Sequence, residues 1–221
     1  MVSFPLNYVF DIYIIYILGF DGGSEPFVIL VGDVGSGKST LFEKLTGTEG
    51  RSSSAKESFT RDSVVCKLEG QIKICDTPGS NAMTNGLEHN AWIAKAINHQ
   101  KVSKLFIIVR ADKAIENVLE NVNNYRENFL DFPEEALSVC VTHMDLVSWK
   151  CSDLLGIIEE ETGIQSKSVI FSKPEISCDV LLHDFIKQCD KEHTLTALPK
   201  HFKVNDMNIK ISKRDVGTKL K

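Results

Sequence analysis

The stretch FVILVGDVGSGKST, residues 27 to 40, decides the fold of this chain. Its first five residues form a short apolar run that predicts a buried strand, and KSTLFEKL after the glycine-rich turn predicts a helix. The turn fits the pattern G-x-x-x-x-G-K-[ST] through Gly32, Gly37, Lys38 and Ser39. The strand, turn and helix supply the structural context that this pattern requires.

Such a turn indicates a loop that binds the phosphates of a nucleotide. Its backbone N–H groups curl round phosphate oxygens, and the helix N-terminus adds partial positive charge. Lys38 places a charge between the outer phosphates, and Ser39 offers a hydroxyl to Mg²⁺. An accidental glycine turn is the alternative, and motif plus context favour nucleoside triphosphate binding. The loop residues expected at the nucleotide are Gly32, Asp33, Val34, Gly35, Ser36, Gly37, Lys38, Ser39 and Thr40.

A second motif, DTPG at residues 76 to 79, follows a predicted strand. Asp76 leaves that strand where a carboxylate is needed beside Mg²⁺. Gly79 supplies a backbone N–H that can approach the γ-phosphate, and the segment can relax when that phosphate leaves. A D-x-P-G turn is common by itself, so its place downstream of the phosphate loop favours a nucleotide switch.

The polar loop of residues 46 to 58 should lead to one more metal ligand. Thr60, just before the next strand, is the preferred hydroxyl, and Ser58 is the alternative. We therefore expect Ser39, Thr60 and Asp76 at the metal. The expected catalytic groups are Lys38, Thr60 and Gly79.

The stretch CVTHMDL, residues 140 to 146, has the features of a guanine-reading loop at a strand end. Guanine presents N1–H and N2–H₂ as neighbouring donors, and one carboxylate, here Asp145, accepts both. Thr142 can hold the loop by bonding to the backbone, and His143 can cover the base by stacking. The alternatives are a helix N-cap role for Asp145 and a solvent-facing His143.

A last loop, FSKPE, follows the final predicted strand. A donor to guanine O6 is expected from this position. Because Pro174 has no N–H, the donor would be the Lys173 amide, with Ser172 shaping the loop.

Strands alternating with helices predict an α/β fold with a mainly parallel sheet. All these motifs fall at the carboxyl ends of strands, where such sheets bind ligands. The predicted strands are 27–31, 63–68, 71–76, 104–110, 136–142 and 168–171, the second and third forming an antiparallel hairpin. The predicted helices are 38–45, 86–100, 112–131, 153–163 and a last one over about 181–189.

Together GDVGSGKS, Thr60, DTPG and THMD resemble the P-loop GTPases of the translation-factor-related class. His143 stands where their base motif N/T-K-x-D has lysine. GSGKST, SFTRD, DTPGSN and VTHMDL are most similar to septin-like and immunity-associated (avirulence-induced type) GTPases, with the chloroplast-import receptor GTPases as relatives. The resemblance covers residues 27 to 190 and implies a three-layer P-loop NTPase fold that binds GTP or GDP with Mg²⁺.

Two positions depart from Ras-type GTPases. Ser80 stands where a glutamine orients the attacking water, and Val34 stands where a small residue lies near the γ-phosphate. Arg61 and Arg110 are candidates for an arginine finger, although a surface or structural role is favoured for each. We therefore expect slow hydrolysis of GTP to GDP and phosphate, completed by a second copy across the nucleotide face.

Three functions are compatible with a phosphate loop of this kind. A GTP-binding switch with slow hydrolysis is preferred. The alternative is a GTP-dependent, homo-oligomerising assembly module in which hydrolysis is incidental. An ATPase or small-molecule kinase would share only the phosphate loop, and DTPG and THMD at successive strand ends argue against it.

The composition fits one domain with extensions. The chain has 221 residues, 43% of them hydrophobic, and a net charge of -5, which argues against nucleic acid as the main partner. We expect an apolar N-terminal extension (1–24), a G domain (25–190) and a basic C-terminal extension (191–221). The six cysteines lack metal-ligand spacing and are expected to be free, buried thiols in a reducing compartment.

The first residues are strongly apolar over 4 to 20. This run is short for a membrane span, Asn7 and Asp11 interrupt it, and no Lys or Arg occurs before Lys38. We therefore expect a cytoplasmic protein, with membrane contact through residues 4–20, peripheral or anchored, as the disfavoured alternative.

Overall fold

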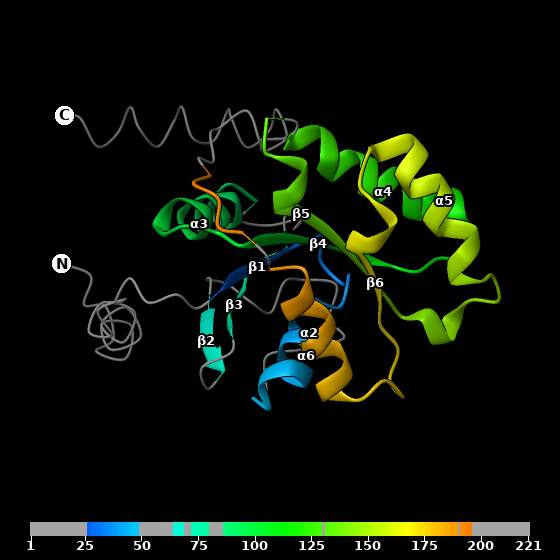
Figure 1. Ribbon diagram of the computed structural model, residues 1–221, viewed down its shortest axis with the longest axis horizontal. Helices are drawn as coiled ribbons and strands as arrows, with labels where there is room; N and C mark the ends of the chain where they lie inside the picture. The colour runs from blue at the N-terminus through cyan, green and yellow to red at the C-terminus, as the bar shows by residue number, and fades with distance from the viewer. Residues whose placement is uncertain are drawn as a thin grey trace.

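The computed structural model describes residues 26–48, 64–68, 72–79, 86–129, 131–189 and 191–195. They form three layers, with a six-stranded sheet between two groups of helices (Figure 1). The strand order is β2-β3-β1-β4-β5-β6, and every neighbouring pair is parallel except β2 and β3. The predicted fold, a mainly parallel sheet with one antiparallel strand, is confirmed.

All six strands lie within one residue of the predicted ranges. Strands β1, β3 and β5 are buried along their whole length, which explains why their sequences are largely apolar. The strands are β1 (Phe27–Val31), β2 (Val64–Leu68), β3 (Ile72–Asp76), β4 (Lys104–Arg110), β5 (Leu137–Thr142) and β6 (Val169–Phe171).

The five helices also follow the prediction, with shifts at their ends. They are α2 (Lys38–Thr46), α3 (Gly86–His99), α4 (Ile115–Asn128), α5 (Cys151–Thr162) and α6 (Cys178–Lys187). Short 3-10 turns occupy Glu134–Ala136, Met144–Leu146 and Ser166–Ser168.

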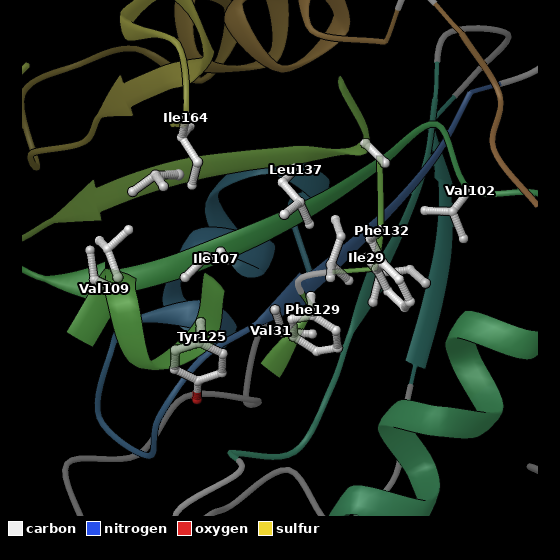
Figure 2. Packing of buried hydrophobic residues seen from close by; sticks show 14 of the residues in the cluster. Ile29, Val31, Val102, Ile107, Val109, Tyr125, Phe129, Phe132, Leu137 and Ile164 are labelled. Carbon is white, nitrogen blue, oxygen red and sulfur yellow. The ribbon is translucent and has the colours of Figure 1, made fainter. Parts of the chain in front are cut away.

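Successive side chains of the strands enter two hydrophobic clusters, one on each face of the sheet. Helices α3, α4 and α5 cover one face and α2 and α6 the other (Figure 1). In β1, Ile29 and Val31 join the first cluster, which Figure 2 shows together with Tyr125 of α4. In the second cluster, Phe106 of β4 stacks on Phe185 of α6 with 4.1 Å between ring centroids. The sheet is therefore fixed from both sides, which holds its strand ends in place.

The packed chain continues past residue 190. His193 and Val102 exchange backbone hydrogen bonds of 2.9 and 2.8 Å, and Leu195 is buried in the first cluster. In the part of the chain that the structure describes, no helix is long and apolar enough to span a membrane. The predicted residues Ser58, Thr60, Arg61 and Ser80, the N-terminal extension 1–24, including the apolar run 4–20, and residues 196–221 lie outside the described residues.

The six cysteines are free thiols, as expected. Cys75 and Cys140 are buried, and burial raises the pKa of the Cys140 thiol to about 12. The expectation of burial is wrong for Cys151, which is exposed at the start of α5, and Cys66, Cys178 and Cys189 are only partly buried.

Candidate functional site

The predicted site residues that the structure describes meet at one edge of the sheet. The loop after β1, the end of β3, the loop after β5 and the loop after β6 all lie at carboxyl ends of neighbouring or parallel strands. The pairing of Leu30 with Asp76 and of Val141 with Phe171 sets these ends level. This edge is the position at which parallel α/β sheets bind ligands.

Lys38 is the charged centre of the phosphate loop. Its ammonium group donates to the carbonyl oxygens of Gly32, at 2.8 Å, and Asp33, at 2.9 Å. Burial lowers the pKa of Lys38 to about 8, while the carboxylates of Asp76 and Asp33 oppose this shift. The loop therefore closes on a buried cation, and an anionic ligand beside it would favour the charged form of Lys38.

Ser39 and Asp76 meet beside that lysine. The Ser39 hydroxyl donates to Oδ2 of Asp76 at 3.0 Å, and the Asp76 side chain is fully buried. Mg²⁺ in nucleotide sites takes one or two protein oxygens and completes its shell with phosphate and water. A hydroxyl and a carboxylate at this spacing fit such an ion, although the third predicted ligand, Thr60, lies outside the described residues.

The DTPG turn lies directly against the phosphate loop. Thr77 donates its hydroxyl to the Leu30 carbonyl at 2.6 Å, which fixes the turn on β1. A Cβ placed on Gly79 would lie 2.5 Å from Cγ2 of Val34 and 2.7 Å from its backbone nitrogen. Only glycine therefore lets the turn come this close to the loop that receives the phosphates.

Thr142 joins the base loop to the phosphate loop. Its buried hydroxyl lies 2.6 Å from the Ser36 carbonyl oxygen, 3.3 Å from the Val109 carbonyl oxygen and 2.8 Å from Nδ1 of His143. The carbonyls can only accept, and the hydroxyl has one proton to give. Nδ1 of His143 must then carry the proton of its own hydrogen bond, so His143 is the tautomer protonated at Nδ1.

His143 packs on the last glycine of the phosphate loop. Its backbone is left-handed, with φ of 56°, and it is the only non-glycine residue with positive φ among the described residues. A Cβ on Gly37 would lie 3.1 Å from Cε1 of His143 and from the Thr142 hydroxyl. Burial and the charge of Arg110 lower the pKa of His143, against the effect of Asp145, so its ring is neutral near pH 7.

A pocket of about 260 Å³ opens between these loops. It is lined by Gly37, Thr40, Leu41, Lys44, Thr142, His143, Asp145, Ser172, Lys173 and Pro174. The predicted base loop and the loop after β6 therefore share one pocket with the first turns of α2. Asp145 lies at its exposed side, and the loops are joined by a bond of 3.3 Å from the Met144 amide to the Ser172 carbonyl.

Two lining residues were missed in the sequence. Leu41 and Lys44 lie on the same side of α2 as Thr40, at the spacing of one helical turn. Lys44 donates to the carbonyl oxygens of Lys173, at 3.1 Å, and Pro174, at 3.0 Å. The helical spacing of residues after the phosphate loop was the sequence signal that could have identified them. Lys44 fixes the loop after β6 to helix α2.

Two further residues border the site. Arg110 ends β4, is exposed, and pairs in register with Thr142, so it lies beside the base loop. Tyr125 of α4 is buried among apolar residues, and its hydroxyl donates to Oδ1 of Asp33 at 2.7 Å. The only sequence signal for this contact is that a buried tyrosine needs a polar partner for its hydroxyl.

The family model described as 50S ribosome-binding GTPase matches residues 27–143. A search of curated proteins found no match. The family match spans the phosphate loop, the DTPG turn and the start of the base loop.

Solved structures of similar fold come from several proteins. The G domain of FeoB from Methanococcus jannaschii is 19% identical with a TM-score of 0.52, over 76% of this chain and 100% of that chain. A dimerization-deficient mutant of Toc33 from Arabidopsis thaliana is 16% identical with a TM-score of 0.56, over 85% and 94%. NFeoB from S. thermophilus, bound to GDP·AlF₄⁻ and K⁺, is 16% identical with a TM-score of 0.54, over 86% and 71%. At these identities the likeness shows the shared fold.

Proposed function

Because the chain belongs to the family described as 50S ribosome-binding GTPases, we propose that it is a molecular switch that binds GTP and GDP with Mg²⁺ and hydrolyses GTP slowly. The observation that carries this proposal is the pocket beside the phosphate loop. Gly37, His143 and Asp145 line it together with Lys173. The phosphates of a nucleotide whose base occupies the pocket would therefore lie beside Lys38.

The phosphates are the first part of the proposed binding mode. Lys38 pairs with the outer phosphates, and the backbone amides of residues 33 to 40 surround them. Ser39, Asp76 and Thr60 hold Mg²⁺, which when bound neutralises charge on the β- and γ-phosphates. The Ser39–Asp76 hydrogen bond supports the first two assignments, because it brings two suitable oxygens together.

The base is the second part. Asp145 accepts N1–H and N2–H₂ of guanine, and the Lys173 amide donates to O6, with Ser172 and Thr142 fixing the two loops. The neutral ring of His143 lies beside Gly37 and covers part of the base plane. A carboxylate at this position repels the N1 acceptor of adenine, so the site distinguishes GTP from ATP.

The switch itself depends on the contact between the DTPG turn and the phosphate loop. Gly79 donates its N–H to the γ-phosphate at the place where it now packs on Val34. When hydrolysis removes that phosphate, the hydrogen bond is lost and the turn can move away from Val34. The coupling of phosphate loss to backbone movement is what makes the domain a switch.

Within the GTPases, we assign the chain to the septin-like and immunity-associated branch. The support is His143 in the position of the usual lysine, in the sequence VTHMDL. The same branch suggests a second candidate function, a GTP-dependent homo-oligomer that forms through the nucleotide face. The similar structure of Toc33 was solved as a dimerization-deficient mutant, which favours a test for dimers of this chain.

The direct test of the switch proposal is competition for a fluorescent GTP. Unlabelled GTP and GDP should displace it, and ATP should need about a hundredfold higher concentration because adenine presents an acceptor at N1 and has no N2 amine to donate to Asp145. Chelation of Mg²⁺ should weaken GTP binding. If ATP competes as well as GTP, the guanine assignment is wrong.

Size-exclusion chromatography together with a turnover assay separates the two functions, because the switch requires turnover that rises with dimer formation and the assembly module requires a stable oligomer in which hydrolysis is incidental. With a non-hydrolysable GTP analogue, the assembly function predicts a dimer or larger species that returns to monomer with GDP. A monomer in both nucleotide states at high protein concentration would leave the switch as the function and remove the assembly alternative.

A further inference from the structure

A carboxylate lies inside the loop that receives the phosphates. Asp33 is the second residue of that loop, and its backbone carbonyl accepts the Lys38 ammonium at 2.9 Å. Its side chain is close enough to Lys38 to affect the charge of that group. A negative side chain here opposes nucleotide binding twice, since it attracts the lysine and repels the phosphates.

Tyr125 holds this carboxylate from outside the loop. Its hydroxyl donates to Oδ1 of Asp33 at 2.7 Å, a short distance typical of a bond to a charged acceptor. The Tyr125 ring is 7% exposed and belongs to the first hydrophobic cluster, from which Figure 2 shows the hydroxyl oxygen pointing away. Val118 and Val122, fully buried on the same helix, fix α4 against the sheet. The donor is therefore rigid.

We propose that Tyr125 sets the preference of the site for nucleoside triphosphate over nucleoside diphosphate by holding the Asp33 carboxylate on α4. This inference rests on the proposed function. Tyr125 is a positioning residue, because it acts on the phosphates only through Asp33. When the hydroxyl is absent, the carboxylate loses its bond to α4 and can shift toward Lys38, the buried cation whose ammonium donates to the Asp33 backbone carbonyl.

The effect differs between the two nucleotides because of charge. A carboxylate that turns to Lys38 weakens the attraction of this lysine for either nucleotide. The triphosphate carries the additional charged phosphate at the outer end of the chain, next to the loop, and is repelled more strongly. Loss of the tyrosine hydroxyl should therefore lower the affinity for GTP more than that for GDP.

The experiment compares Kd values of GDP and of a non-hydrolysable GTP analogue in the wild type and in Tyr125→Phe. Phenylalanine keeps the buried ring and removes only the donor. The preference for the triphosphate should fall about three- to tenfold, because only part of the energy of the lost charge-assisted hydrogen bond appears as a difference between the two nucleotides. A purely structural role would lower thermal stability and leave the ratio of the two Kd values unchanged, which would overturn the inference.

Asp33→Asn is an independent test, since asparagine can still accept a hydrogen bond from the tyrosine hydroxyl but carries no charge. Asp33→Asn should raise the preference for the triphosphate, and adding Tyr125→Phe to it should not change the ratio further. If Tyr125→Phe lowers the ratio equally with and without Asp33→Asn, the effect does not pass through the carboxylate and the inference fails.

Asn117→Ala is the matched control on the same helix. Asn117 donates to Asp112 at 3.1 Å and is exposed, so its loss should leave the ratio of Kd values as in the wild type. An equal fall in this variant would assign the effect to α4 in general and overturn the role of Tyr125. A wild type that binds no guanine nucleotide would instead refute the proposed function, an outcome visible before any variant is made.

Discussion

Thr142 shows how a single hydroxyl can join two functional loops. It is buried, belongs to the base loop, and donates to the carbonyl of Ser36 in the phosphate loop. Thr142→Ala removes this bond and leaves the carbonyl without its donor. We expect a loss of about 1–2 kcal/mol in the free energy of unfolding and a several-fold weaker GTP affinity, because the two loops are no longer held together. Urea unfolding and GTP titration measure the two effects.

Thr162 is a matched control for that variant. It is equally buried, donates to the Ile158 carbonyl at 2.7 Å, and accepts from the Ile164 amide at 3.1 Å at the end of α5. Thr162→Ala should cost a similar free energy of unfolding and leave GTP affinity unchanged. If both variants lose the same affinity, Thr142 has only a general structural role.

Lys38 predicts a pH dependence of nucleotide binding. Burial lowers its pKa to about 8 without nucleotide, and phosphates raise it by favouring the charged form. Above pH 8 the free protein has lost this proton and must take it up on binding. Affinity should therefore fall, approaching tenfold per pH unit. The unliganded protein should gain stability over the same range, because the unfolded chain, with a pKa near 10.5, binds more protons.

Calorimetry at pH 8.5 in two buffers of different ionisation enthalpy measures the proton uptake. Inorganic tripolyphosphate is the control, because it has no base and should show the same uptake. Zero uptake with both ligands would contradict the burial of a titrating Lys38.

At the scale of elements, α6 packs on the sheet through buried side chains that include one stacked aromatic pair. Phe185 is fully buried and stacks on Phe106 of β4 at an angle of 26°. Phe185→Ala should cost about 3–5 kcal/mol in the free energy of unfolding, since a large cavity opens beneath the sheet. Val180→Ala on the same helix is the control, since Val180 is 53% exposed and its loss should cost under about 0.5 kcal/mol. Equal shifts in urea unfolding would contradict this packing.

The helix ends show where sequence prediction stops. The apolar spacing correctly predicted α4 but placed its start at residue 112, whereas the helix begins at Ile115. The Asp112 carboxylate instead accepts a hydrogen bond from the Ala114 amide at 3.1 Å and stabilises a turn before the helix. Helix α5 begins earlier than predicted because Asp153 accepts the Lys150 amide at 2.9 Å. Such caps depend on side-chain geometry that hydrophobic periodicity does not encode.

The site was predictable where local motifs carry it. Strand ends and glycine spacing predicted two loops that the structure brings together at one edge of the sheet. The contact between Tyr125 and Asp33 spans 92 residues, and no local pattern indicates it. The sequence likewise gives no sign of the left-handed backbone of His143, because this conformation depends on packing against Gly37 and Thr142. Long-range contacts between elements therefore supplied what the sequence alone could not.

At the scale of the whole molecule, we expect a second copy of the chain to complete the site for hydrolysis. Ser80 stands at the position where a glutamine would orient the attacking water. Leu146, next to Asp145 at the base loop, is 51% exposed and would provide an apolar contact for a second copy. Turnover per molecule should therefore rise with protein concentration until a dimer is saturated. An equal mass of inert protein is the control for non-specific effects. Rapid turnover that does not depend on protein concentration would contradict a shared site.

The proposed function depends above all on hydrogen bonds from guanine to the Asp145 carboxylate. The measurement is competition by GTP, xanthosine triphosphate and ATP against a fluorescent nucleotide, on the wild type and on Asp145→Asn. Asp145→Asn should weaken GTP binding about a hundredfold and gain binding of xanthosine triphosphate, because the amide can donate to the additional carbonyl of xanthine. Unchanged GTP affinity in the variant, together with no gain for xanthosine triphosphate, would contradict it.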